Sequence, residues 1–489
     1  MFFCIKDAEH LCLFPEYFIE ELRQTAGILS GPLKIAGQII LRPDFEKIEA
    51  SIKNDQLHLS QSRALSRNRG FQNSGGQKHP SAQLVVAFFI ARHFYDNCYG
   101  ERGYRMLCEN SSLQDFIGRL GLSSFPSRNT IHEQINALSE QTLELFHQSI
   151  LSCVEESGLD DFSAVIIDST GIKADSAWPV DSELLKKLSC KIMGKIERIH
   201  DKLSYSERKA ISLKRLQNSC DNFKKLDFAI SMLKGKKGAR QMRRQLYTKE
   251  LLPKCRKFIK RLEEILPKIK QHCSVIQSML IDEYFSRFVD KVLMVEHRFK
   301  MAPENYDVKT ARKIYSMSDD DAVFIKKGGR ETVFGYRPSF AFSASGFLTA
   351  FTLETGNTSD SKAFIKCLEK SEQMTEKTPA MISVDDGYCS SENLNHAIQN
   401  GTALISFSGS KGRKLLGDDV YESENYQLAR NLRSISEAGI SKLKNYHNLA
   451  RYTVCGIKRV RQQTLIKAIG FNLERLCQLL CQNHVKVAA

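Results

Sequence analysis

The chain has 489 residues, of which 42% are hydrophobic and 26% charged, which is typical of a soluble globular protein with room for two or three domains. Its 71 lysines and arginines outnumber its 56 aspartates and glutamates, and the net charge of +15 indicates a polyanionic partner. The 14 cysteines include no C-x-x-C pair, so we expect reduced thiols and no zinc or iron–sulfur site. No run of apolar residues is long enough to span a membrane, and we expect a cytoplasmic protein.

The N-terminal part is predicted to be largely helical. Residues 61–80 are polar, basic and glycine-containing, which predicts a flexible connector. In residues 81–157 the apolar side chains recur at helical spacing, and Ser127 is placed to cap a helix that follows a Gly–Pro break. This segment is either a plain helical bundle or a DNA-binding helix-turn-helix.

A short apolar run at 164–167 predicts a buried strand that ends on Asp168. A carboxylate at the tip of a buried strand is held rigidly, and hard metal ions need rigid oxygen ligands. The alternative is that Asp168 only begins a turn, so its role depends on partners elsewhere in the chain. The segment that follows contains the only tryptophan of the chain, Trp178.

Residues 182–300 are predicted to form a long helical insertion. Its centre, residues 234–270, has 14 lysines and arginines against three acids. Interleaved apolar residues would bury one face of these helices and leave the cations on the other. Such a basic face is either solvated or contacts phosphates, and the concentration of a single sign favours phosphate contact. The cations expected to contact phosphates here are Lys236, Lys237, Arg240, Arg243 and Arg244.

Strand signals return after residue 320 and predict a mixed α/β sheet. Residues 333–342 and 347–353 flank a Ser-Ala-Ser-Gly turn and are predicted to pair as a hairpin. After a helix, short apolar runs predict strands at 379–385 and 402–407, and further helices follow. The sequence thus divides into an N-terminal segment with its connector (1–80), a helical domain (81–157) and a sheet core in two pieces (158–181 and 301–475). A basic insertion (182–300) separates the two pieces of the core, and a C-terminal tail (476–489) follows.

Asp385 repeats the arrangement at Asp168, because it directly ends a short apolar strand. Ligands of open α/β sheets gather at the carboxyl edge of the strands, so the two carboxylates converge there if their strands are neighbours. We prefer Asp385 to Asp386 because Asp385 ends the strand and precedes an x-Gly dipeptide.

Arg433, Glu437, Ile440 and Lys444 share one stripe of a predicted helix, and Arg430 falls on the same stripe. Intrahelical ion pairs would explain this spacing, although each contributes only about 0.3–0.5 kcal/mol. The stripe has more cations than its one acid can pair with. Surplus positive charge beside a metal-binding carboxylate suits a phosphodiester that lies across the site.

These residues resemble the DDE transposases of bacterial insertion sequences. The resemblance rests on D-[SG]-T-x-I-x-A followed by W-P-x-D-S-x-L-L, which begins at Asp168, and on G-N-x-x-D, which ends at Asp360. It rests further on D-x-G-Y-x-S, which begins at Asp385, and on E-x-x-I-S-x-L-K, which begins at Glu437.

Many such enzymes carry the signature Y-x2-R-x3-E-x6-K. This chain matches it at Arg433, Glu437 and Lys444, but has Arg430 where the tyrosine would stand. That departure removes whatever role the tyrosine would have, while an arginine retains the ability to contact phosphate.

The resemblance implies an α/β fold with an RNase H-like mixed-sheet catalytic core, an N-terminal all-helical domain and a long helical insertion. It implies that Asp168, Asp385 and Glu437 are catalytic and hold two Mg²⁺ (or Mn²⁺) ions. One ion would activate a water or 3′-hydroxyl nucleophile and the other would stabilise the leaving oxygen, so that no protein base is needed.

The resemblance also implies double-stranded DNA as the partner, both transposon ends and target. The enzyme would bind terminal inverted repeats, cleave the strand and transfer it, with Arg430, Arg433 and Lys444 orienting the scissile strand. The basic block and the N-terminal helices would grip the repeats. By analogy we expect a homodimer on DNA, no membrane partner, and a bacterial cytoplasmic location that is nucleoid-associated on DNA.

Two other functions remain open. A catalytically inactive relative would bind end DNA with a steep salt dependence and leave it uncut. An RNase H-like nuclease would stop at cleavage, whereas strand transfer joins DNA.

Overall fold

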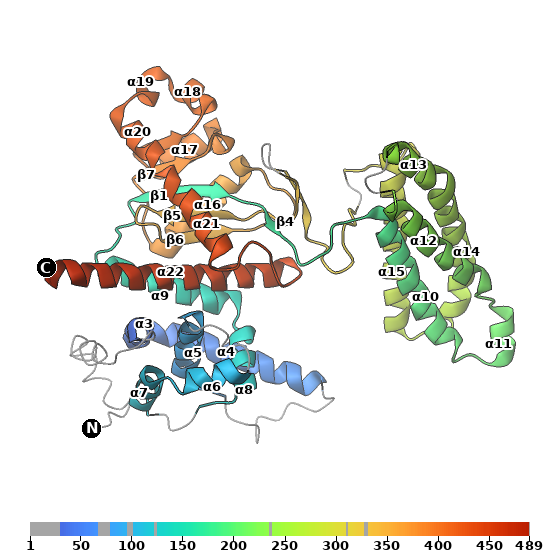
Figure 1. Ribbon diagram of the computed structural model, residues 1–489, viewed down its shortest axis with the longest axis horizontal. Coiled ribbons are helices and arrows are strands. Elements are labelled where there is room, and N and C mark those ends of the chain that lie inside the picture. The colour runs from blue at the N-terminus through green and yellow to red at the C-terminus, as the bar shows by residue number, and fades with distance from the viewer. Residues whose placement is uncertain are drawn as a thin grey trace. The chain divides into compact units, whose positions relative to one another are not determined.

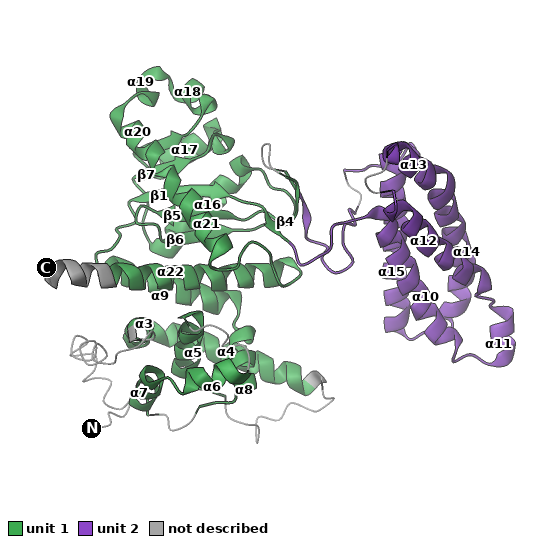
Figure 2. Cartoon of the chain, viewed as in Figure 1, with its two compact units in different colours: residues 1–173, 325–489 green, residues 174–324 purple. Residues whose placement is uncertain are grey.

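The chain divides into two compact units, unit 1 (residues 1–173 and 325–489) and unit 2 (residues 174–324), which Figure 2 colours separately. The computed structural model describes residues 30–66, 79–94, 101–121, 125–233, 237–309, 312–326 and 331–488. Of the helices in this described part, none combines the length and the apolar character needed to cross a membrane.

A mixed sheet that comprises five strands in the described residues lies at the centre of unit 1 (Figure 1). In spatial order its strands are β6 (Leu348–Thr352), β5 (Ser339–Ser343), β1 (Ala164–Ser169), β7 (Met381–Val384) and β8 (Leu404–Phe407). The β6–β5 and β5–β1 pairs are antiparallel, whereas β1–β7 and β7–β8 are parallel. Numbered by appearance along the chain, this order is 3-2-1-4-5, which is an RNase H-like sheet, so the expected fold class is confirmed.

Both faces of the sheet are covered, which explains why β1 is apolar without alternation and buried throughout. Val165 and Ile167 share a buried cluster with Phe364 of α16 (Asp360–Thr375). Phe342, the partner of Ile166 across β5 and β1, instead packs beneath α21 (Arg433–Asn445). Since side chains alternate between the faces of a strand, α16 and α21 lie on opposite sides of the sheet.

The predicted strand 333–342 is wrong as a single strand. It forms β4 (Val333–Tyr336), which pairs with β2 (Ile172–Lys173), and β5, which pairs with β1. Pro338 lies between the two and has no N–H to donate to a ladder, so the chain changes sheets there. With β3 (Val323–Ile325), β2 and β4 form the second described sheet. The predicted hairpin itself is present, as β5 and β6 around Gly346.

The remaining helices of unit 1 surround this sheet or form the N-terminal bundle. In chain order they are α3 (Ser30–Leu41), α4 (Phe45–Ser66), α5 (Ala82–Phe94), α6 (Glu101–Cys108), α7 (Ser111–Arg119), α8 (Arg128–Ala137), α9 (Glu140–Glu156), the 3₁₀ turn Asp386–Tyr388, α17 (Ser391–Gln399), α18 (Ser410–Leu416), α19 (Asp418–Tyr421), α20 (Glu424–Asn431) and α22 (Ile457–Ala488).

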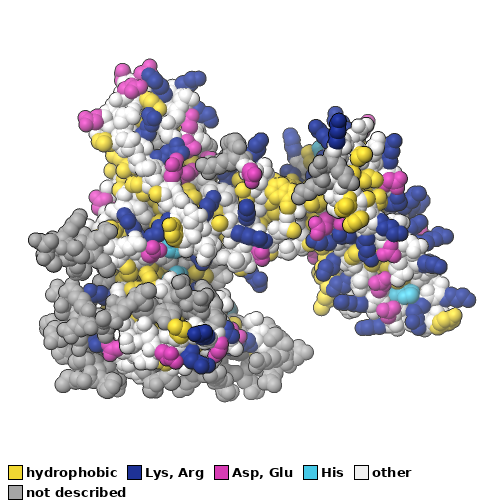
Figure 3. Space-filling view, in the orientation of Figure 1, with side chains coloured by type: hydrophobic (Ala, Val, Ile, Leu, Met, Phe, Trp, Pro, Cys, Tyr) yellow, Lys and Arg dark blue, Asp and Glu magenta, His cyan; other side chains and the backbone are white. Residues whose placement is uncertain are grey.

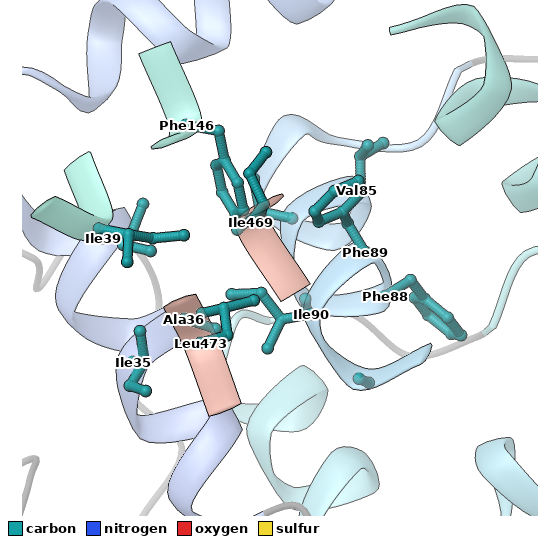
Figure 4. Packing of buried hydrophobic residues seen from close by; sticks show 14 of the residues in the cluster. Ile35, Ala36, Ile39, Val85, Phe88, Phe89, Ile90, Phe146, Ile469 and Leu473 are labelled. Carbon is teal, nitrogen blue, oxygen red and sulfur yellow. The ribbon is translucent and has the colours of Figure 1, made fainter. Parts of the chain in front are cut away.

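The N-terminal helices share one core with the C-terminal helix. Figure 4 shows Phe89 and Ile90 of α5 near Phe146 of α9 and Ile469 and Leu473 of α22. α22 extends through the residues that we expected to form a C-terminal tail. α4 likewise continues to its end inside the predicted connector, whose residues 67–78 lie outside the described part.

Unit 2 is a helical bundle with its own apolar core. Its helices are α10 (Asp181–His200), α11 (Tyr205–Ala210), α12 (Lys214–Ser231), α13 (Ala239–Gln245), a π-helical turn (Leu246–Leu251), α14 (Leu252–Lys270) and α15 (Val275–Arg298). The predicted insertion, 182–300, lies inside this unit. At its base, Asp181 forms ion pairs with Arg298 and with the fully buried Lys291, whose Nζ lies 2.7 Å from Asp181 Oδ1.

Candidate active site

Asp168 is the penultimate residue of β1, and Asp385 directly follows the neighbouring parallel strand β7. In the β1–β7 register Ile167 is opposite Val384, and each of these residues is followed directly by its aspartate. Asp168 is 8% exposed, and its Oδ1 accepts a hydrogen bond from the Ser169 N–H at 2.7 Å. The structure therefore brings the two predicted carboxylates to the same edge of the sheet.

Asp385 and Asp386 point to different partners. Asp386 accepts hydrogen bonds from the backbone N–H groups of Lys411 and Gly412 at the start of α18, each at 3.1 Å. Asp385 Oδ1 instead accepts from Ser408 Oγ, which follows β8, at 3.0 Å. Asp386 therefore accepts N–H groups at the start of α18, whereas Asp385 contacts the residue that follows β8.

Arg433 joins Asp385 to Glu437. Its Nη1 donates to Asp385 Oδ1 at 3.2 Å and to Ser408 Oγ at 2.8 Å, while its Nη2 donates to Glu437 Oε1 at 3.0 Å. The Glu437 side chain is 61% exposed, so this pair by itself adds little stability. The helix α21 therefore carries the third predicted acid beside the strand ends.

Lys444 secures the other end of α21. Its Nζ donates to Thr170 Oγ1 at 2.5 Å and to the Gly171 carbonyl at 3.1 Å, just beyond Asp168. The same helix approaches β5 closely, because a Cβ at Gly439 would lie 2.5 Å from the Phe342 ring. α21 is thus fixed against the sheet at both ends and in the middle.

Arg430 does not continue the stripe of α21. The helix breaks at Leu432, where the N–H groups of Leu432 and Ile435 bond to carbonyls three residues back. Arg430 belongs to α20, and its guanidinium lies 5.6 Å from the centre of the Tyr421 ring. The expected alignment of Arg430 with Arg433 is therefore wrong, and its contact with DNA stays a prediction.

A buried ion pair that the sequence did not reveal lies beneath these acids. Arg337 Nη2 donates to Asp360 Oδ2 at 2.7 Å, and Ser169 Oγ donates to Asp360 Oδ1 at 2.5 Å. Burial, followed by the charges of Asp360 and Asp168, raises the pKa of Tyr388 well above its usual value of 10. The available signal was the G-N-x-x-D segment, which ends at Asp360 but resembles an ordinary helix start.

The donor chemistry fits a divalent cation in part. Asp168 and Asp385 supply hard oxygen donors from adjacent, rigid strands, as such ions require. Glu437 is held by Arg433, and among the described side chains no group of three or more His, Cys, Asp or Glu is arranged around a metal position. Asp168 and Asp385 are thus on adjacent strands, while Asp385 and Glu437 both pair with Arg433 and would have to exchange that pairing for a metal ion.

Positive charge gathers in unit 2. It holds 33 lysines and arginines against 20 acids, so that +13 of the total charge of +15 falls in this unit. Figure 3 shows the basic side chains across its visible face. Lys237, Arg240, Arg243 and Arg244 are exposed and have no ion-pair partner among the described residues, while Lys236 lies outside them.

Trp178 lies in unit 2 and is 55% exposed. Its ring packs edge-to-face on Phe324, with centroids 5.3 Å apart, and Phe324 packs in the same way on Tyr315. Part of the indole is therefore used in packing, and the rest faces solvent beside a small hollow that Pro179 and Lys187 help to line.

Residues 305–473 match the family model described as "Transposase DDE domain". The matched segment covers about a third of the chain and includes Asp360, Asp385, Glu437 and Lys444, while Asp168 precedes it. No curated protein matches the chain significantly, and neither does any solved structure.

Proposed function

We propose that this chain, which is a DDE transposase by the family of its residues 305–473, cuts DNA at the ends of an insertion sequence and joins the freed strands to target DNA. The observation that carries the proposal is the placement of the acids. Asp168 and Asp385 end adjacent parallel strands, and Arg433 ties Glu437 to Asp385.

Members of this family generally use divalent metal ions. Asp168, Asp385 and Glu437 are the residues that would hold Mg²⁺ or Mn²⁺ here, two ions being expected. When bound, such ions lower the pKa of the attacking hydroxyl and neutralise charge on the leaving oxygen. Burial and the backbone hydrogen bond keep Asp168 in one orientation, which limits the rearrangement needed for binding.

Arg433 and Lys444 would place the scissile phosphate. Arg433 presents a planar donor fork between two carboxylates, and this fork also suits the oxygens of a phosphodiester. If Glu437 turns toward a metal ion, the Arg433 guanidinium gains free donors for the DNA backbone. Lys444 lies about 16 Å further along α21 at 1.5 Å per residue, so the two cations would contact different phosphates.

Unit 2 would supply most of the affinity for DNA. Its net charge of +13 and the exposed arginines of α13 suit sequence-independent contact with phosphates. Base recognition of the terminal repeats would fall to other residues, including the helices of the N-terminal bundle. Pairing of two DNA ends by two copies of the chain is part of the proposal.

A product assay tests this function and separates it from the alternatives. The substrate is the gene with its flanking DNA on both sides, incubated with the full chain and Mg²⁺ alongside a labelled target plasmid. We expect cleavage at inverted repeats and joined products. Asp168→Asn, Asp385→Asn and Glu437→Gln should bind the DNA and leave it uncut, while the matched control Glu354→Gln, an ion-paired surface acid, should behave as wild type.

Three outcomes would overturn the proposal. Cleavage without joined products would identify a nuclease. Binding without any cleavage by the wild type would identify an inactive relative. Cleavage that survives both aspartate substitutions would place the active site elsewhere.

A further inference from the structure

Asp360 adds another carboxylate to this edge of the sheet, at the first residue of α16. Its two oxygens already have donors: Ser169 Oγ lies 2.5 Å from Oδ1, and Arg337 Nη2 lies 2.7 Å from Oδ2. The side chains of Asp360 and Arg337 are only 11% and 12% exposed. A carboxylate in this state is neutralised by its arginine and is poorly suited to bind a metal ion directly.

The Arg337–Asp360 pair contacts the end of β1. Arg337 Nε donates to Ser169 Oγ at 3.3 Å, so both members of the pair hold the same hydroxyl. Ser169 directly follows Asp168, and its N–H donates to Asp168 Oδ1. The position of the Ser169 peptide therefore affects the direction in which the Asp168 carboxylate points.

The same pair contacts the end of β7. A Cβ at Gly387 would lie 3.0 Å from Asp360 Oδ2, so the glycine after Asp386 lets the carboxylate lie against this turn. The next residue, Tyr388, is fully buried, and the centroid of its ring lies 6.4 Å from that of Phe364 of α16. Asp360 is thus in contact with the segments that follow both Asp168 and Asp385.

We propose that the Arg337–Asp360 pair is a positioning clamp, which fixes the ends of β1 and β7 so that Asp168 and Asp385 keep the spacing that a divalent cation needs. This inference rests on the proposed function, because it assumes that these two acids bind the metal. Partners that orient metal ligands in this way typically change metal affinity by about 10–100-fold.

Metal affinity of the full, DNA-free chain is the direct test. Mn²⁺ is titrated into each variant, and free Mn²⁺ is followed by electron paramagnetic resonance. Asp360→Asn keeps the shape of the side chain but loses its charge, and should weaken Mn²⁺ binding by about 10–100-fold. The matched control Glu354→Gln removes an ion-paired acid outside the site and should leave Mn²⁺ affinity unchanged.

A second variant keeps the test decisive if Asp360→Asn does not fold. Ser169→Ala leaves Asp360 and Arg337 in place and removes only the hydroxyl that joins them to β1. It should weaken Mn²⁺ binding by less than about 10-fold. Thermal unfolding without metal, measured in parallel, shows whether each variant is folded at the titration temperature.

The outcomes separate this inference from the proposed function. If Asp168→Asn leaves Mn²⁺ affinity unchanged, the proposed metal site itself is wrong. If Asp168→Asn abolishes binding while folded Asp360→Asn and Ser169→Ala bind as wild type does, only the clamp is wrong. If Asp360→Asn abolishes binding and Ser169→Ala has no effect, Asp360 is itself a ligand, which also overturns the clamp.

Discussion

Gly439→Ala tests whether α21 is held against the sheet as closely as the geometry requires. The added Cβ would lie 2.5 Å from Phe342 Cε1 and 2.8 Å from Cζ, whereas carbon atoms in contact prefer about 3.5–4.0 Å. Phe342 is fully buried and packs on Phe471 and Phe340, so its ring has little room to yield. The helix itself must therefore move away by about 1 Å.

Two effects of opposite sign set the expected stability. Overpacking of this kind costs about 1–3 kcal/mol, and alanine in place of glycine in a helix returns up to about 1 kcal/mol. We expect a net loss of roughly 1 kcal/mol in the free energy of unfolding of unit 1. The rate of DNA cleavage should fall more, by about 100-fold, because Arg433, Glu437 and Lys444 would be displaced by about 1 Å.

Urea unfolding and cleavage of end DNA measure these two quantities. The matched control is Gly118→Ala in α7, where a Cβ would meet open space among the described atoms. That variant should be as stable as wild type or more stable by up to about 1 kcal/mol, with unchanged cleavage. If Gly439→Ala behaved like this control in both measurements, the inferred fit between α21 and β5 would be refuted.

Three further predictions concern charge. Asp181→Ala leaves the buried Lys291 ammonium without its carboxylate and should destabilise unit 2 by about 3–5 kcal/mol. Limited proteolysis should then cleave this unit earlier than in wild type. The control Asp221→Ala removes an exposed ion pair and should cost at most about 1 kcal/mol. Changing Arg240, Arg243 and Arg244 together to Gln should reduce the slope of log affinity for DNA against log salt concentration by about 3. Changing the ion-paired Lys254 and Arg256 should reduce this slope less. If the triple variant had the same slope as wild type, α13 would not contact phosphates. Burial lowers the pKa of His147 to about 4 from its ordinary 6.5, so the stability from its neutral ring is fully present above about pH 6.5 and is lost as the pH falls toward 4. Unfolding free energies measured from pH 7.5 to pH 4.5 should show this loss, up to about 3 kcal/mol, in wild type and less of it in His147→Gln.

The sequence was most informative where one local signal sufficed. Four apolar residues before Asp168, and a similar run before Asp385, predicted buried strands that end in acids. Their place at one edge follows from the fold class, because parallel strands of an open sheet present their carboxyl ends there, but their adjacency is seen only in the strand order. Asp386 caps α18, and the preference for Asp385 as the metal-binding acid stays a prediction.

The sequence was least informative where distant residues meet. Arg337 and Asp360 are 23 residues apart, and each looks ordinary on its own, one before a strand and the other at a helix start. The helix break at Leu432 involves neither proline nor glycine, so the periodicity of the sequence placed Arg430 on the wrong helix. The division of residues 333–342 at Pro338 was visible in principle, since proline rarely lies inside a paired strand.

The most direct test of the central claim is the anomalous scattering of Mn²⁺ in crystals of the protein bound to its end DNA. We expect a peak within coordination distance, about 2.0–2.3 Å, of carboxylate oxygens of both Asp168 and Asp385, with Glu437 turned away from Arg433. A fully occupied Mn²⁺ that contacts neither aspartate, in crystals with DNA across α21, would contradict the assignment of these acids as the metal site.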